Sequence, residues 1–395
     1  MSYQLFHLDA LSALRSAAGA WDDLWRRSEV VMPLACAEPL AMWYEHFAPA
    51  ASVRILVVAE QDRFVAALPL VGGRLGRCLP VGRLPACAWS LAGDLLVDEQ
   101  AAWDPVLDTL AKGVSRLAWP LLWFDGVPVE TPRWRALRQA TQRAGWPTMA
   151  VDQPRVAEVA LAADWDAYLA GRSRNHRRNI RRASRRFSER GGRLLVYDDP
   201  SPDRVDALIT RGFEVERRSW KHRSGSTVID TPGMLDFYCR QARYLAGRGQ
   251  LMLAVLEHEG RAISFHYGYR AKASYLLMKI AYDTAFADWS PGRLLMAEMI
   301  RWLHENQTEI QRIDFLGPVS SATMPWKTGT YGLGRLVVAP GGRFGETLLR
   351  AYRQTRPWFH RLPATGHQPQ AKQEPRSTDP CRPRPSPEMH ADTHV

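Results

Sequence analysis

The stretch from Gln250 to Tyr269, QLMLAVLEHEGRAISFHYGY, contains two apolar runs separated by a short, acid-rich turn with a glycine. This pattern is typical of two antiparallel strands joined by a tight turn. The same plan occurs earlier in the chain, from Ser52 to Leu70, as SVRILVVAEQDRFVAALPL. Two copies of one hairpin in a single chain suggest a duplicated unit.

The segments around the two hairpins repeat as well. A helical stretch that begins with proline precedes each hairpin, at Pro39 and at Pro232. After each hairpin come a helix and a short strand that ends in an aspartate near glycine, at Asp125 and Asp314. All three features recur at a spacing of about 190–200 residues, as an internal duplication predicts.

The length of the chain agrees with two domains, because 395 residues exceed what one ordinary core organises. We expect an α/β fold with two similar domains, at 1–158 and 159–345, each a mixed sheet flanked by helices. Residues 346–395 form a proline-rich tail that we expect to be disordered, since few large apolar residues follow Arg361.

The basic charge is concentrated in one segment. The formal net charge is +11, and residues 172–193 contain ten arginines and one acid, so the rest of the chain is close to neutral. This distribution disfavours a nucleic-acid-binding surface spread over the whole protein.

The cysteines and the apolar runs indicate the cellular compartment in which the protein works. The five cysteines form no CxxC pair, which argues against a disulfide framework or a zinc site, and we expect no metal. No run is long enough to span a membrane and the N-terminus does not resemble a signal peptide. We expect a cytoplasmic protein without stable membrane insertion, and peripheral contact with the inner membrane stays open.

The arginine-rich segment SRNHRRNIRRASRRF, residues 173–187, predicts an amphipathic helix that ends at Gly191-Gly192. A helical period places four residues on one narrow stripe: His176, Ile180, Ala183 and Phe187. A solvated charged face is the ordinary interpretation of a polar helix. Here the charges have one sign and repel each other along the helix, which favours a functional role.

Familiar catalytic motifs such as GxSxG, HExxH, the P-loop and GxGxxG are absent from the sequence. One candidate site is the stretch 281–305, in which a strand leads through Asp283 to Ser290-Pro291-Gly292 at the start of a helix. Serine before proline is good capping chemistry, and glycine lets an anion approach the free backbone N–H groups. The alternative is a plain helix start.

Two further stretches contain reactive side chains. In 312–332, Asp314 ends a strand and Trp326-Lys327 follow on a loop, so the carboxylate can be a base, an orienting group or a surface ion pair. In 214–226, Trp220 and Lys221 lie at a helix end. Taken singly, such residues are more often structural than catalytic.

In their order, these stretches resemble a known family. The arginine-rich helix, SWK, GRAISFHYGY, the YD and SPGRLL segments, and IDFLG with a lysine loop are similar to GNAT-superfamily acyltransferases of the CelD/BcsL type, which are associated with cellulose biosynthesis and related to the FemAB peptidyltransferases. The resemblance covers roughly residues 10–340. It implies tandem GNAT-like domains and acyl transfer to an amine or hydroxyl, from acetyl-CoA or another acyl-CoA, or from aminoacyl-tRNA in the FemAB branch.

The resemblance also implies roles for residues. The loop before Gly292 stands where GNAT enzymes bind the pyrophosphate of the donor, although the usual signature is reduced here to Ser-Pro-Gly. The expected donor site comprises Asp283, Ser290, Pro291, Gly292 and Arg293. The first domain has no equivalent of the arginine helix or of this loop, so we expect it to shape the acceptor cleft and to lack a donor site.

For catalysis we expect Asp314 as the general base, His266 as the second choice, and Lys327 as a group that stabilises an oxyanion or holds a phosphate. A core role for His266 is the alternative. The expected substrate-binding residues are Arg178, Arg181, Arg185, Trp220, Lys221, Trp326 and Tyr331.

The leading hypothesis is an acyltransferase that acylates a sugar or an amine in envelope or exopolysaccharide synthesis. Its partners are then a phosphate-bearing donor, which includes acyl carrier protein as an option, and a sugar or amine acceptor. A FemAB-like enzyme that uses aminoacyl-tRNA is less favoured. A non-catalytic scaffold that docks an acidic partner through the arginine helix is the third hypothesis.

Overall fold

The computed structural model describes residues 2–51, 53–75, 79–161, 164–340 and 342–359. Both predicted hairpins are present: β2 (Arg54–Glu60) pairs with β3 (Arg63–Leu75), and β12 (Leu251–His258) pairs with β13 (Arg261–Ala271). Each has a two-residue turn whose first residue is left-handed, at a φ of 55° in Gln61 and 48° in Glu259. Each also carries a β-bulge beside its turn.

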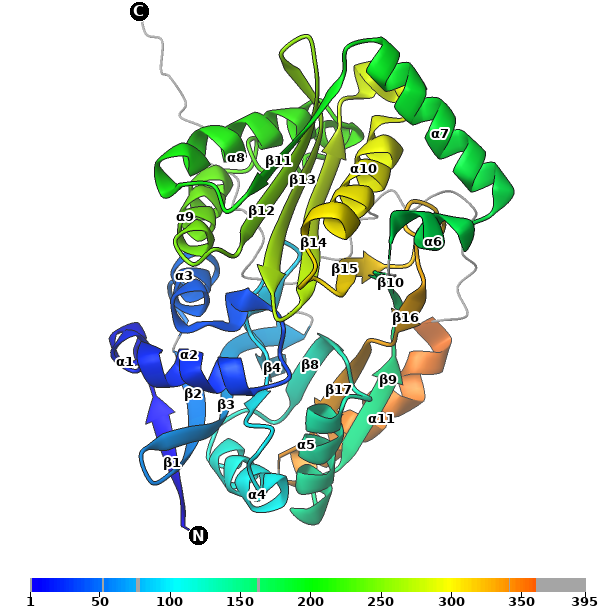
Figure 1. Ribbon diagram of the computed structural model, residues 1–395. Helices are drawn as coiled ribbons and strands as arrows, with labels where there is room; N and C mark the ends of the chain where they lie inside the picture. Colours follow the sequence, from blue (N-terminus) through cyan, green and yellow to red (C-terminus); the bar gives the residue numbers. More distant parts are fainter. Residues whose placement is uncertain (1, 52, 76–78, 162–163, 341, 360–395) are drawn as a thin grey trace, which may run out of the picture.

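Each hairpin belongs to a larger mixed sheet (Figure 1). The first sheet has the order β1-β2-β3-β4-β8-β17-β9, with β7 paired to β3. Its other strands are β1 (Tyr3–Leu8), β4 (Leu79–Arg83), β7 (Leu96–Val97), β8 (Leu122–Val127), β9 (Thr148–Asp152) and β17 (Gly334–Val338). A two-stranded ribbon, β5 (Ala86–Cys87) and β6 (Ser90–Leu91), lies outside this sheet.

The second sheet has the order β11-β12-β13-β14-β15-β10-β16. Its other strands are β10 (Val156–Ala160), β11 (Arg193–Asp198), β14 (Ser274–Tyr282), β15 (Arg312–Pro318) and β16 (Gly329–Tyr331).

The two sheets have the same pattern of pairing. In each, the first four strands are antiparallel neighbours, the fourth and fifth strands are parallel, and the last two pairings are antiparallel again. This agreement confirms the expectation of two similar α/β units.

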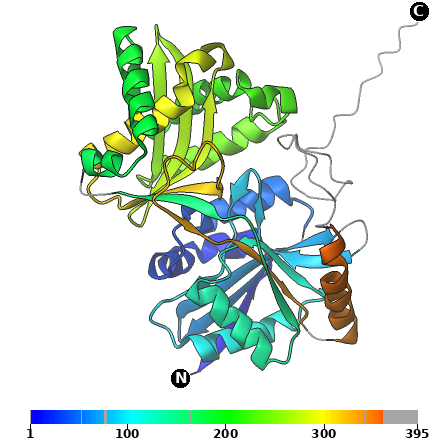
Figure 2. The same cartoon turned by 90° about the vertical axis from the view of Figure 1, so that its right-hand side faces the viewer.

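The units exchange a strand. β10 follows β9 after three residues but lies in the second sheet, between β15 and β16, whereas β17 returns to the first sheet, between β8 and β9. Figure 2 shows these two strand pairs running between the lobes. The predicted boundary at 158/159 therefore falls inside β10, and β17, which the sequence assigned to the C-terminal domain, completes the first sheet. Apolar patterning predicts a strand but does not identify its pairing partner.

Helices cover both faces of each sheet (Figure 1). On the first sheet, α4 (Trp103–Val114) and α5 (Pro132–Arg143) pack on one face. The other face is covered by α1 (Leu11–Ser16), α2 (Ala18–Arg27), the 3₁₀ helix η1 (Pro33–Ala35) and α3 (Ala37–Phe47).

On the second sheet, α8 (Pro202–Arg217) and α9 (Met234–Ala246) cover one face. The opposite face carries α6 (Trp165–Ala170), α7 (Arg174–Glu189) and α10 (Pro291–Asn306). Two 3₁₀ helices complete this half, η2 (Trp220–Ser224) and η3 (Thr284–Trp289).

The two halves share one apolar core at the contact between α3 and α9. The rings of Phe47 and Phe237 meet there with centroids 4.9 Å apart, and Arg240 forms a 2.9 Å ion pair with Glu45. Tyr238 donates a 2.6 Å hydrogen bond to the carbonyl of Trp89. These contacts hold the two halves in position relative to each other.

The C-terminal segment differs in part from the prediction. Residues 343–359 form helix α11 (Arg343–Phe359), and the buried Leu349 packs it against the first sheet. The expectation of disorder from residue 346 onward was therefore wrong up to residue 359, because a few apolar side chains suffice to anchor a helix on an existing core. The remainder, 360–395, lies outside the described residues. Within the described part of the chain, no helix has the length and apolarity needed to cross a bilayer.

Candidate active site

The first pocket is basic and lies between α7 and the start of α10. It has a volume of about 520 Å³, and we call it the arginine pocket. Its lining residues are Asn179, Arg182, Ala183, Arg186, Phe187, Arg190, Asp288, Trp289, Ser290 and Arg293. Four arginines face one carboxylate, so the pocket attracts an anion such as a phosphate.

Helix α7 forms one wall of this pocket in the predicted way. Ser173 caps the helix by accepting from the His176 N–H at 3.3 Å, and Gly191 ends it with a φ of 70°. The predicted stripe points inward: His176, Ile180 and Phe187 are buried and Ala183 is half-buried. Ser184 donates a 2.7 Å hydrogen bond to Glu298, which ties α7 to α10.

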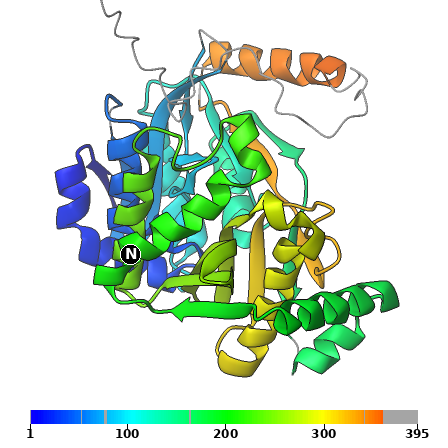
Figure 3. The same ribbon diagram turned by 90° about the horizontal axis from the view of Figure 1, so that it is seen from above.

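The arginines that line the pocket are not the predicted ones. Arg182, Arg186 and Arg190 border the buried stripe on the side of α10, whereas Arg178, Arg181 and Arg185 are exposed and outside the pocket. The helical period identified the stripe but did not reveal on which side of it α10 lies. In Figure 3, α7 lies beside α10 at the edge of the molecule.

The start of α10 provides the opposite wall. Pro291 is the first helical residue, and helix geometry leaves the N–H groups of the first turn, at Gly292 and Arg293, without an intrahelical acceptor. A Cβ added to Gly292 would lie 3.2 Å from Cδ1 of Tyr282, so a larger residue would displace that ring. The predicted serine cap is absent, because Ser290 has a left-handed backbone and its side chain makes no capping hydrogen bond.

Trp289 is an aromatic residue that lines the arginine pocket. The guanidinium of Arg190 lies over its ring at 4.3 Å from the centroid, and the ring of His258 packs against it at an angle of 69° with the centroids 4.8 Å apart. The cation–π contact directs Arg190 into the pocket.

Asp283 is engaged in structural contacts. It is buried, accepts from the Ala285 N–H at 3.0 Å, and forms ion pairs with Arg218 at 2.8 Å and Arg261 at 2.5 Å. Burial alone would raise the pKa of Asp283, but these hydrogen bonds and cations outweigh it and lower that pKa. Asp283 lines neither pocket and fixes the turn that leads to η3 and α10.

The second pocket is acidic and lies between the two halves. It has a volume of about 610 Å³, and we call it the interdomain cleft. Its carboxyl side chains are Glu29, Asp94, Asp125, Glu130, Glu158 and Asp314. Only two arginines, Arg133 and Arg312, are among its lining residues, and Val30, Met32 and Leu91 add apolar surface.

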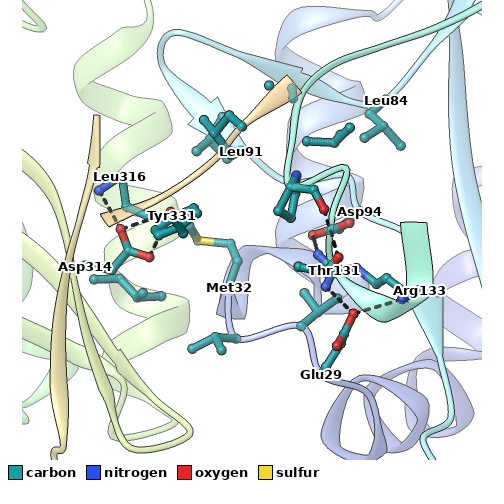
Figure 4. Close-up of a pocket in the computed structure, with 18 of the residues that line it drawn as sticks. Glu29, Met32, Leu84, Leu91, Asp94, Thr131, Arg133, Asp314, Leu316 and Tyr331 are labelled. Atoms are coloured by element: carbon teal, nitrogen blue, oxygen red, sulfur yellow. Dashed lines mark hydrogen bonds and ion pairs between the residues drawn. The ribbon is translucent and has the colours of Figure 1, made fainter. Parts of the chain in front are cut away.

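Asp314 is the buried carboxylate of this cleft (Figure 4). Tyr331 donates to its Oδ2 at 2.9 Å and to its Oδ1 at 3.2 Å, and the Leu316 N–H donates to Oδ1 at 2.8 Å. Burial raises the pKa of Asp314 above its ordinary value, although these hydrogen bonds and Arg312 oppose the rise. A carboxylate with a raised pKa is suited to accept a proton.

The N-terminal half contributes an ion triad around a buried arginine to the opposite wall (Figure 4). Arg133 is buried and pairs with Glu29 at 2.7 Å and with Asp94 at 2.9 Å. Two carboxylates on one guanidinium leave this wall with an excess of negative charge. These three residues could not be predicted from the sequence, because they come from separate elements of the first half and no local motif connects them.

The parallel strands β14 and β15 form a fork. They pair over three positions, from Ser274–Arg312 to Leu276–Asp314, and no further pairing between them occurs in the described residues. Leu276 and Asp314 line the interdomain cleft, whereas the far end of β14 leads through η3 to Ser290 in the arginine pocket. From Leu276 to Tyr282 the strand spans about 20 Å at its usual rise per residue.

Two apolar side chains in this region are exposed, one on β14 and one at the start of η2. Trp220 is 57% exposed and Ile280 is 39% exposed. Lys221, the residue after Trp220, contacts this strand: its Nζ donates to the Ile280 carbonyl at 3.0 Å and pairs with Glu216 at 2.9 Å. Trp220 and Lys221, both predicted from the sequence, therefore lie beside the fork.

Three other predicted residues lie outside both pockets. His266 is buried on β13, opposite Ala254, and burial lowers its pKa to about 3. Trp326 is buried against His176 with ring centroids 4.4 Å apart. The loop of Lys327 is held by Arg172, which donates to the carbonyls of Trp326 and Lys327.

Residues 174–328 match the family model of the acetyltransferase (GNAT) domain. This segment is similar to a GNAT acyltransferase domain. The match begins at the first residue of α7 and includes both the start of α10 and the fork. The chemistry that this match supports for the segment is acyl transfer, and the fold of the chain is the tandem GNAT-like α/β architecture that the sequence predicted.

Solved structures share this fold over almost the whole chain. FemX superposes with a TM-score of 0.57 at 11% identity, covering 88% of this chain and 99% of FemX. A conserved protein of unknown function from Bacteroides thetaiotaomicron VPI-5482 superposes with a TM-score of 0.53 at 11% identity, covering 85% and 99% of the two chains. A search of curated protein sequences finds no significant match.

Proposed function

We propose that the protein transfers an acyl group from a phosphate-bearing thioester to an amine. The donor phosphates bind in the arginine pocket and the acceptor binds in the interdomain cleft. The observation behind this proposal is the opposite charge of the two pockets at the two ends of β14. Four arginines face Asp288 in one pocket, whereas six carboxyl groups face two arginines in the other.

Acyl-CoA, with acetyl-CoA as the first candidate, is the simplest donor. Its phosphates pair with Arg182, Arg186, Arg190 and Arg293 and with the first N–H groups of α10. The arm then follows β14 past Ile280 and Trp220, and the thioester reaches the fork near Asp314. The strand length of about 20 Å between the pockets is a distance that an extended arm can cover.

The acceptor is an amine, because the cleft is rich in carboxylates and an ammonium group is attracted there. The ammonium must lose one proton to become a nucleophile, and Asp314 is the residue placed to take it. The nitrogen forms a bond to the acyl carbon, the bond from carbon to sulfur breaks, and the thiolate leaves. The second proton leaves the nitrogen as the adduct collapses and is taken up by the departing sulfur. Tyr331 keeps the carboxylate in position by donating to both oxygens.

The acceptor class that we favour is an amino sugar or another amine of envelope or exopolysaccharide synthesis, as in the CelD/BcsL group that the sequence resembles. The cleft combines carboxylates with apolar side chains such as Met32 and Leu91, a lining suited to a polar ring with a cationic substituent. We propose the cytoplasm, where acyl thioesters are made, as the compartment.

The N-terminal unit shapes the acceptor side only. Its α4 occupies the position of α10, between the fourth and fifth strands of its sheet, but its first turn carries Asp104 and no basic residue. An acid at a helix start repels a phosphate. We therefore propose that the protein has one donor site, in the second unit.

The test is a product assay with acetyl-CoA and a panel of amino sugars, run with the matched hydroxyl sugars. Amide product with the amino sugars and none with the hydroxyl sugars supports the proposal. Release of free CoA that is independent of every amine, or no consumption of the thioester, would refute it.

A further inference from the structure

The outer face of α7 carries arginines that neither pocket uses. Arg174, Arg178, Arg181 and Arg185 are exposed and lie outside the arginine pocket. Of these four arginines, only Arg185 forms an ion pair within the described residues. Its partner is Glu189, at 3.5 Å, and both side chains are exposed. An exposed pair of this kind contributes little to stability.

These arginines do not hold the helix in place. Three buried side chains of α7 and the hydrogen bond from Ser184 to Glu298 anchor it. The arginines instead repel each other along the helix, because 174 and 178, 178 and 182, 181 and 185, and 182 and 186 are four residues apart. Each such pair disfavours the helix by a few tenths of a kcal/mol. A structural role therefore does not explain them.

The outer face is continuous with the arginine pocket. At 3.6 residues per turn, Arg178, Arg181 and Arg185 lie within about 60° of one another and adjoin Arg182 and Arg186. The band from Arg174 to Arg185 is about 17 Å long at the rise of an α-helix. α7 lies at the rim of the molecule (Figures 1 and 3). The band is on the side of the helix opposite the buried His176, Ile180 and Phe187, so it faces away from the sheet.

We propose that this band docks an acidic carrier protein that presents its acyl thioester on a phosphopantetheine arm. The inference rests on the proposed function, since it names the donor of the same reaction. The arm of such a carrier leaves the protein surface through a phosphodiester. The phosphate site and the docking surface must therefore be neighbours, as the arginine pocket and the outer face of α7 are. With CoA as the donor, in contrast, the phosphates would contact only the four arginines of the pocket, and the outer face of α7 would have no role.

The surface fits an acidic protein better than an RNA. The arginines of this band all lie on one helix of 16 residues, and both aromatic rings of that helix, His176 and Phe187, are buried. Proteins that bind single-stranded RNA use exposed aromatic rings to stack on the bases, and proteins that bind a folded RNA need a wider basic surface. Outside residues 172–193 the chain is close to neutral.

The test compares two charge-reversal variants of the full chain. The first is Arg178→Glu/Arg181→Glu/Arg185→Glu, which lies outside the arginine pocket. The matched control is Arg116→Glu/Arg135→Glu/Arg204→Glu, with the same change of charge at exposed arginines elsewhere. The measurements are kcat/KM with acetyl-loaded acyl carrier protein and with acetyl-CoA, and binding of the unacylated holo-carrier and of bulk tRNA at low and moderate salt.

We expect the α7 variant to lose about tenfold or more in kcat/KM with the carrier-borne thioester and less than about twofold with acetyl-CoA. The control variant keeps both values. Equal losses with the two donors, no binding of the holo-carrier by the wild type, or salt-dependent binding of tRNA alone would overturn the inference. If the wild type consumes acetyl-CoA but ignores the carrier, only the inference fails. If it consumes neither donor, the proposed function fails with it.

Discussion

Tyr331 donates hydrogen bonds to both carboxylate oxygens of Asp314, at 2.9 and 3.2 Å. The two residues lie on β16 and β15, and the strand between them is β10, which enters from the N-terminal half of the chain. In β10, Val156 pairs with Tyr331 and Glu158 pairs with Asp314. The geometry of the proposed base thus depends on the strand exchange between the two units.

Replacing Asp314 by asparagine removes the proposed base and keeps the shape of the side chain. We expect kcat to fall by about 10²–10⁴, the usual contribution of a general base. The folded-state pKa of Asp314 is raised by burial, so ionisation costs stability as the pH rises through that pKa. The variant avoids this cost, and thermal unfolding at neutral pH should show a melting temperature equal to or above that of the wild type. An unchanged kcat would exclude Asp314 as the base.

Tyr331→Phe tests the support of that base. The hydrogen bond from Tyr331 lowers the pKa of Asp314, so its loss should raise that pKa further. The acidic limb of the kcat/KM profile should move to higher pH. Tyr197→Phe on β11, at the opposite edge of the sheet, is the control and should leave the profile in place. A lower rate with no shift of the limb would show that Tyr331 acts in another way.

Arg186→Gln tests the arginine pocket. The side chain lines this pocket and makes no contact with the interdomain cleft. Removal of one phosphate contact should raise the KM for acetyl-CoA by about tenfold, in line with a charged hydrogen bond of roughly 1.5–3 kcal/mol. The KM for the amine should not change. Arg193→Gln, just beyond α7, is a matched control, and an equal effect there would contradict the assignment.

Asp283→Asn separates a structural role from donor binding. Loss of the charge leaves Arg218 and Arg261 without their carboxylate, and we expect a decrease in unfolding free energy of about 1–3 kcal/mol. The pKa of Asp283 is lowered in the folded state, so its contribution is present above the unfolded-state pKa and is lost as the pH falls through the folded value. Denaturant unfolding of the two proteins should therefore converge in acid. A raised donor KM with unchanged stability would restore the predicted role in donor binding.

A fragment that begins at Asp164 tests the strand exchange. It lacks β10, so β15 and β16 lose the strand between them and expose their edges. We expect the fragment to be insoluble or to lack a cooperative unfolding transition, although it contains the whole segment 174–328. A soluble fragment with a cooperative transition would show that the second unit folds without β10.

The sequence predicted the elements well where a local pattern decides them. The hairpin at Glu259–Gly260, the inward stripe of α7 and its end at Gly191 all form as expected. These features depend on periodicity and on backbone conformations that glycine allows.

The relations between distant elements were predicted less well. The side of α7 that lines the pocket depends on where α10 packs, so Arg182 and Arg186 replace Arg178 and Arg181. Trp326 was expected to bind substrate, but its ring is buried against His176. The strand exchange was also missed, because apolar patterning does not identify a pairing partner.

The assignment of donor and acceptor to the two pockets is tested by steady-state kinetics of Arg186→Gln and Asp314→Asn with acetyl-CoA and one amine acceptor. We expect Arg186→Gln to raise the donor KM and keep kcat, and Asp314→Asn to lower kcat and keep the donor KM. A loss of kcat in Arg186→Gln together with full activity in Asp314→Asn would contradict the assignment of donor and acceptor to the two pockets.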